Sequence, residues 1–159
     1  RTGDGRRFVA EAIGGVMSLT GGAFLVRRFC FDPDARMATM SEEALFLPFD
    51  LSAIEPDDGG PDPARVIKGN PRTRTWLVEE RDAEKLYSGV WEATPGAWRV
   101  VYDEWEFCSI LSGSSGVHQD GVPTPIVLRA GDSFILRPGF SGIWEVKETT
   151  RKLFVIRMP

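Results

Sequence analysis

The sequence contains very little histidine and cysteine. Its 159 residues include one histidine, His118, and two cysteines, Cys30 and Cys108, which lie far apart. Zinc, iron and copper sites draw most of their ligands from imidazole and thiolate groups, and structural sites place these residues at short spacings. No such spacing occurs, so we expect no histidine-ligated metal. Two distant cysteines also form no disulfide framework, which is typical of a protein of the reducing cytoplasm.

Positive charge is scarce as well. The chain has 19 Lys and Arg against 23 Asp and Glu, a net charge of −4, and no basic stripe. Nucleic-acid binding depends on the neutralisation of phosphates by basic residues, so this acidic chain is not expected to bind nucleic acid. The most apolar stretch, residues 8–26, contains Glu11 and four glycines. We therefore expect neither a signal segment nor a membrane-spanning helix.

The length is that of one domain, and charge divides it unevenly. Residues 1–39 carry a net charge of +2 and residues 40–159 one of −6. Because Met40 and the residues after it read like a natural start, we interpret residues 1–39 as a poorly structured extension from an overextended gene start. Residues 40–70 are expected to form an irregular N-terminal arm, since turn formers at 57–63 argue against helix and strand there. Residues 71–159 form the expected folded domain.

After residue 73, β-rich segments alternate with turn formers. The expected strands are 75–78, 86–93, 98–102, 106–111, 117–119, 125–128, 133–136, 143–146 and 153–156. Gly113–Gly116 is expected to close one hairpin and Glu148–Arg151 to form another turn. Short strands separated by turns at roughly ten-residue spacing predict an all-β sandwich or barrel. No helical period of useful length follows Met40.

Several runs within residues 69–157 together resemble a known family. They are Gly69-Asn70-Pro71, Arg74-Thr75-Trp76, residues 89–96, Tyr102-Asp103-Glu104, Glu106-Phe107-Cys108, Gly131-Asp132-Ser133-Phe134, residues 139–146 and Arg151-Lys152. The set is similar to the cupin-3 group, named after the cupin domain of ureidoglycine aminohydrolase, and more distantly resembles the ethanolamine-utilisation cupin. The resemblance implies an all-β cupin fold, a double-stranded β-helix or jelly-roll barrel, that is commonly a homodimer.

The resemblance also implies a metal-motif frame over residues 96–113. In that frame a glycine precedes two histidines, a glutamate, six further residues and a second glycine. Glu106 and Gly113 fill the last two places. The histidine places hold residues without an imidazole: Arg99 and Val101, or Val100 and Tyr102, in this motif, and Gly142 in the second cupin motif. The expected cofactor is therefore none, or a weakly bound Mn²⁺ or other hard divalent cation.

Three residues of this frame, Tyr102, Glu104 and Glu106, are two apart and so point to one face of an extended strand. If that face is the barrel interior, the two carboxylates converge with the phenol, where they would bind a hard cation or a polar molecule, or act as acid and base. The alternative is that Asp103 and Glu104 sit in a solvated turn and that Glu106 alone points inward.

The remaining candidates each have two interpretations. Arg99 is either a buried counter-charge for Glu106 or a surface residue. The large aromatic side chains either line a ligand pocket or simply pack the core; they are Trp91, Trp98, Phe140 and Trp144. His118 is either a base or an exposed hairpin residue. Cys108 shares the parity of Glu106 and is expected to be an inert, buried thiol.

The sequence thus predicts a cupin that binds a small polar metabolite in its barrel without a histidine-ligated metal. The expected ligand-binding residues are Trp91, Arg99, Tyr102, Glu104, Glu106, Phe140 and Trp144. The alternative is a hydrolase or isomerase resembling ureidoglycine aminohydrolase, which would act through Glu106, Glu104 and Tyr102 with a weakly bound metal. A third interpretation is a structural dimer module whose barrel is filled by its own side chains.

Overall fold

The computed structural model describes residues 44–159, and the predicted extension and its boundary at residue 39 lie outside this range. The described part consists of nine strands and one 3-10 helix, η1 (Pro63–Arg65). The predicted all-β class is therefore confirmed. None of the helices in the described range is long and apolar enough to cross a membrane.

The strands follow one another with short connections. They are β1 (Asp57–Gly59), β2 (Val66–Gly69), β3 (Thr73–Arg81), β4 (Leu86–Ala93), β5 (Gly96–Tyr102), β6 (Trp105–Gln119), β7 (Ile126–Arg129), β8 (Ser133–Leu136) and β9 (Phe140–Arg157). The bounds of β4 and β8 agree with the sequence prediction, because both β-rich segments are followed closely by Pro-Gly turn formers.

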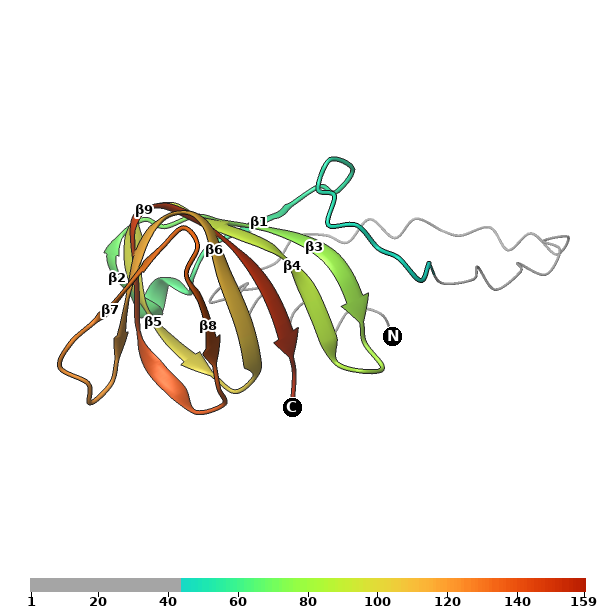
Figure 1. Cartoon of the computed structure of the whole chain (residues 1–159). Coiled ribbons are helices and arrows are strands. Elements are labelled where there is room, and N and C mark those ends of the chain that lie inside the picture. Colours follow the sequence, from blue (N-terminus) through green and yellow to red (C-terminus); the bar gives the residue numbers. More distant parts are fainter. Residues whose placement is uncertain (1–43) are drawn as a thin grey trace, which may run out of the picture.

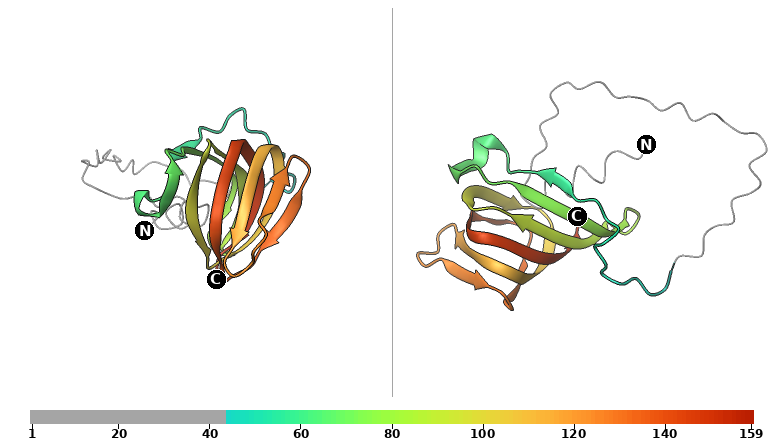
Figure 2. Two further views of the ribbon diagram at one scale, coloured as in Figure 1. Left: turned by 90° about the vertical axis from the view of Figure 1, so that its left-hand side faces the viewer. Right: turned by 90° about the horizontal axis from the view of Figure 1, so that it is seen from above.

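The two longest strands, β6 and β9, connect the other strands into one nine-stranded sheet. The first part of β9 pairs with β5 and its last part with β4, while β6 pairs with β8 through its first part and with β7 through its last. Because β6 and β9 also pair with each other along most of their length, the sheet curls into one jelly-roll (Figures 1 and 2). The hydrophobic core lies on the inner side of this curled sheet.

The predicted hairpin at Gly113–Gly116 and the predicted turn at Glu148–Arg151 are both wrong, since β6 and β9 continue through them. The register between β6 and β9 shifts between Ile110 and Ser115, so the strands bend there by bulging instead of reversing. Gly113 has φ 82, and a Cβ on it would lie 2.2 Å from the Thr149 carbonyl oxygen. The turn-forming residues Gly113–Gly116 therefore allow the strand to bend.

The expectation of an irregular arm up to residue 70 is wrong for two segments. Asp57–Gly59 pairs with Thr73–Thr75 as β1, and Val66–Gly69 pairs with β5 as β2. Both strands lie at sheet edges, where a strand pairs on one side only and turn formers are tolerated. Before β1 the arm stands away from the strands in Figure 1, with Phe46 83% exposed.

The hydrophobic core consists of buried side chains on strands β4 to β9. It contains Tyr87, Trp91, Ala93, Trp98, Val100, Tyr102, Ile110, Val117, Leu128, Leu136, Trp144, Val146, Phe154 and Ile156. Burial of this apolar surface is the main stabilising contribution to the fold. Ionisable side chains are buried as well, among them Glu104, Glu106 and Lys152.

Candidate functional site

The alternation of buried and exposed residues continues without a break from β5 into β6. Tyr102, Glu104, Glu106 and Cys108 are all buried, and Glu104 and Glu106 are 3% and 0% exposed. The alternation continues through the bend between the two strands. There the Asp103 N–H donates to Glu104 Oε2 at 2.9 Å, which holds this carboxylate in the interior. The predicted convergence of Tyr102, Glu104 and Glu106 is therefore confirmed, and a solvated Glu104 is excluded.

The counter-charge of Glu106 is Lys152, a residue for which the sequence suggested no such role. Lys152 is 1% exposed, and its Nζ donates to Glu106 Oε1 at 2.8 Å and to Cys108 Sγ at 3.5 Å. A charge in a protein interior is tolerated only when it is paired in this way. One signal was available, because Lys152 shares the parity of the core residues Phe154 and Ile156.

Two indole rings complete the surroundings of the ammonium group. Lys152 Nζ lies 5.2 Å from the ring centroid of Trp91 and 5.0 Å from that of Trp144, both within cation–π range. Trp91 also contacts Trp98, with ring centroids 6.2 Å apart. Trp91 and Trp144 thus pack in the core and at the same time flank the buried ammonium group.

Burial sets the protonation of the cluster. It raises the pKa of Glu104 to about 7, and the nearby Glu106 carboxylate acts in the same direction. Burial and then Glu106 raise the pKa of Tyr102 well above its usual range. Burial alone would lower the pKa of Lys152, but its neighbours Cys108 and Glu106 outweigh this and raise it. At neutral pH the cluster therefore contains a charged ammonium, a neutral phenol and a carboxyl near its midpoint.

Besides Ser88 Oγ and Arg151 Nε, four buried polar atoms of the cluster and its surroundings have no hydrogen-bond partner within residues 44–159. These unsatisfied atoms are Glu104 Oε1, Glu106 Oε2, Trp98 Nε1 and Trp144 Nε1. The two carboxylate oxygens are acceptors and the two indole groups are donors. A buried polar atom without a partner costs about 1–3 kcal/mol, so four in one barrel call for an explanation.

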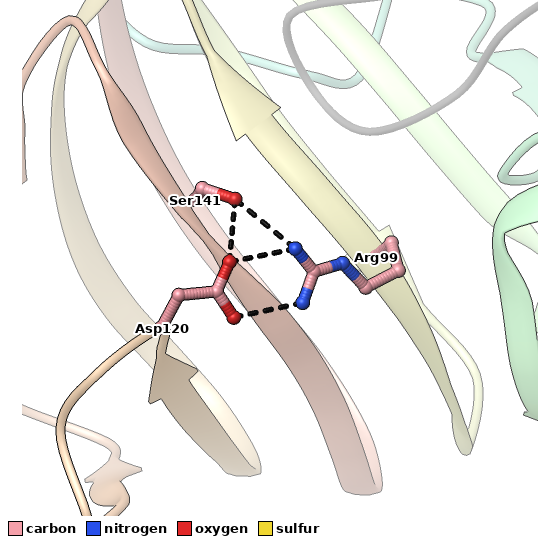
Figure 3. Close-up of polar contacts among 3 residues, drawn as sticks. All are labelled: Arg99, Asp120 and Ser141. Carbon is pink, nitrogen blue, oxygen red and sulfur yellow. Dashed lines mark hydrogen bonds and ion pairs between the residues drawn. The ribbon is translucent and has the colours of Figure 1, made fainter.

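Arg99 is not the counter-charge of Glu106. Its guanidinium group donates to Asp120 Oδ1 at 2.8 Å, to Asp120 Oδ2 at 2.6 Å and to Ser141 Oγ at 3.1 Å (Figure 3). The hydrogen bonds from Arg99 and Ser141 lower the pKa of Asp120 to about 2. Since Trp98 and Val100 point inward from β5, Arg99 lies on the outer face. The surface interpretation is confirmed, and Arg99 is removed from the interior site.

The other candidates fall outside the charged cluster or at its margin. His118 is on the outer face of β6, with its Nε2 atom 3.6 Å from Glu145 Oε2 and its side chain 41% exposed. Phe140 is partly buried and meets the Tyr102 ring edge-on at 5.9 Å between centroids. Over the described range there is no group of three or more His, Cys, Asp or Glu side chains suited to a metal ion.

A hollow of about 300 Å³ also lies on the outside, next to β1, β3 and β4. Its lining includes Arg72, Arg74, Asp58 and Glu92. Arg74 pairs with Asp58 at 3.3 Å, and its guanidinium carbon lies 5.0 Å from the ring centroid of Trp76. The hollow contains none of the residues predicted for the site.

Residues 80–154 match the family model described as the EutQ-like cupin domain. Among curated proteins, none matches this chain. Two solved structures with a similar fold are a protein of unknown function of the DUF861 family from Pseudomonas syringae pv. tomato and a predicted oxalate decarboxylase from Thermotoga maritima. The first is 22% identical with a TM-score of 0.59, covering 67% of this chain and 45% of that one. The second is 19% identical with a TM-score of 0.55, covering 71% and 100%.

The EutQ protein of Clostridium difficile is 15% identical with a TM-score of 0.49, covering 55% of this chain and 63% of that one. This chain therefore spans less than two thirds of the EutQ and Pseudomonas chains. At such identities the solved structures show a common fold alone. The chain has the cupin fold, and its residues 80–154 are similar to the EutQ-like cupin domain.

Proposed function

We propose that this protein binds a small polar molecule inside its cupin barrel without a histidine-ligated metal. The observation that supports the proposal is the set of four unsatisfied atoms defined above. A molecule with N–H or O–H groups would donate to Glu104 and Glu106, and a carbonyl or hydroxyl oxygen on it would accept from Trp98 and Trp144. Aromatic walls with a few convergent polar groups are typical of small-molecule sites.

The charges of the cluster favour a neutral ligand. Lys152 and Glu106 compensate each other at 2.8 Å, and the pKa of Glu104, about 7, leaves that carboxyl partly protonated at neutral pH. A strongly charged ligand would bring an uncompensated charge into the interior, which is costly. Amides and polyols combine donors and acceptors without a net charge, so they form the ligand class that this interior suits best.

The experiment is a thermal-shift and calorimetric panel. Neutral amides and polyols are compared with carboxylates of the same size, using wild type and a Trp98→Phe variant. Phenylalanine keeps an aromatic ring at residue 98 but removes the unsatisfied N–H, so we expect the same ligand to bind at least tenfold more weakly. Arg99→Lys on the outer face is the matched control and should bind like wild type. A panel without any binder at millimolar concentrations would favour the filled structural module.

One observation favours a catalytic role as a second candidate. Glu104 has a pKa of about 7 and lies beside Glu106 and Tyr102. A general acid or base works best when its pKa is near the working pH. In a hydrolase or isomerase of the ureidoglycine aminohydrolase kind, Glu104 would then be the proton-transferring group, because Glu106 is tied to Lys152. Turnover that survives in Glu104→Gln would refute this role. The homodimer and the cytoplasmic location stay predictions.

A further inference from the structure

Lys152 places a positive charge in the interior, and the side chains around its ammonium group are ones that attract cations. Its Nζ atom lies 2.8 Å from Glu106 Oε1 and 3.5 Å from Cys108 Sγ. The ring centroids of Trp91 and Trp144 lie at 5.2 Å and 5.0 Å from it. A carboxylate together with two aromatic faces is the environment in which proteins bind ammonium ligands.

The carboxylates near this ammonium group have acceptor oxygens to which Lys152 does not donate. Glu106 Oε2 and Glu104 Oε1 both lack a hydrogen-bond partner in the described part of the chain, and both are buried. The surroundings therefore suit a cation, and the cation present is covalently attached to the protein. The donor set does not fit a transition metal, since one carboxylate oxygen of Glu106 is occupied and residues 44–159 contain no suitable group of three ligands.

We infer that Lys152 is a built-in cation that determines which charges the barrel accepts. Its ammonium occupies the position between Glu106, Trp91 and Trp144, and it thereby repels free amines and divalent metal ions. A second cation at Glu106 would have to share one carboxylate with Lys152 in an interior of low dielectric constant, where like charges repel strongly. This charge selectivity holds whether or not the proposed polar molecule binds.

A chemical-rescue experiment tests the inference. Lys152→Ala removes the outer part of the side chain, which corresponds to n-propylammonium. We expect this variant to unfold at a lower temperature than wild type and to regain stability as n-propylammonium chloride saturates one site. Wild type should respond to that salt no more than to sodium chloride. Lys152→Met is the matched control, because methionine fills the space without the charge and should also show no rescue.

Two comparisons make the outcome decisive. Adding Glu106→Gln to Lys152→Ala should weaken propylammonium binding at least tenfold, since the carboxylate partner is lost. n-Propanol, which has the same number of heavy atoms but is neutral, should not restore stability. Equal binding of propylammonium by wild type and by Lys152→Ala would overturn the inference, as would a folded Lys152→Ala variant that shows no rescue.

If Lys152→Ala does not fold, the wild-type protein decides the question. One equivalent of Mn²⁺ is added, and the indole N–H resonances of Trp98 and Trp144 are followed by NMR spectroscopy. Both groups are buried in the interior, so a paramagnetic ion beside Glu106 would broaden them. The inference predicts unchanged resonances, and selective broadening of the two at one equivalent would overturn it.

Discussion

The buried pair of Lys152 and Glu106 predicts a strong energetic coupling. Their side chains are 1% and 0% exposed and are joined at 2.8 Å, so removing one partner leaves the other charged and buried. Breaking such a pair costs about 3–5 kcal/mol, whereas replacing both charges by neutral groups of similar volume is often close to neutral. We therefore expect Lys152→Met and Glu106→Gln each to destabilise the fold by about 3–5 kcal/mol. The double variant should lose far less than their sum.

The assay is equilibrium unfolding in urea, followed by the fluorescence of the five tryptophans. The coupling energy is the difference between the double variant and the sum of the two singles, and we expect at least about 2 kcal/mol. The outer pair of Arg99 and Asp120, joined at 2.6 Å, gives a matched cycle at the surface, where the coupling should be much smaller. Additivity of the two interior substitutions within about 0.5 kcal/mol would refute the reasoning.

Three further predictions concern single groups. Burial raises the pKa of Glu104 to about 7 from a reference value of 4.5. The contribution of this carboxyl to the free energy of unfolding is therefore fully present below pH 4.5 and is lost as the pH rises through 7. Glu104→Gln should therefore be more stable than wild type at pH 8, by up to about 3 kcal/mol, and no more stable than wild type at pH 4.5. An equal change in the free energy of unfolding at both pH values, measured by urea unfolding, would contradict this. Burial raises the pKa of the Cys108 thiol, so in a Cys30→Ser background a thiol reagent should modify it only at the rate of unfolding, and rapid labelling of that variant would show that Cys108 is accessible. Phe46 is 83% exposed, so Phe46→Ser should change the free energy of unfolding by no more than about 0.5 kcal/mol, and a larger loss would show that the arm is packed.

Local pattern was enough to predict the inward face of the site. Tyr102, Glu104 and Glu106 alternate with outward residues, and this parity is a property of the strand itself. Lys152 could not be assigned in the same way, because a lysine is almost always a surface residue. Its partner Glu106 is 46 residues away in the sequence, and only the pairing of β6 with β9 brings the two together.

The bends of β6 and β9 show a second limit of sequence reasoning. Glycine and serine at Gly113–Gly116 satisfy the requirements of a hairpin and of a bulged bend equally well. The choice depends on the pairing of β6 with β9, whose residues lie far along the chain. The same holds for β1, where Asp57–Gly59 pairs at a sheet edge despite its turn-forming composition.

The metal content of protein purified without chelator tests the central claim most directly. A barrel whose cation position is held by Lys152 should contain every first-row transition metal at well below one equivalent by elemental mass spectrometry. One equivalent of zinc, iron, manganese or nickel that disappears in Glu106→Gln would contradict the account.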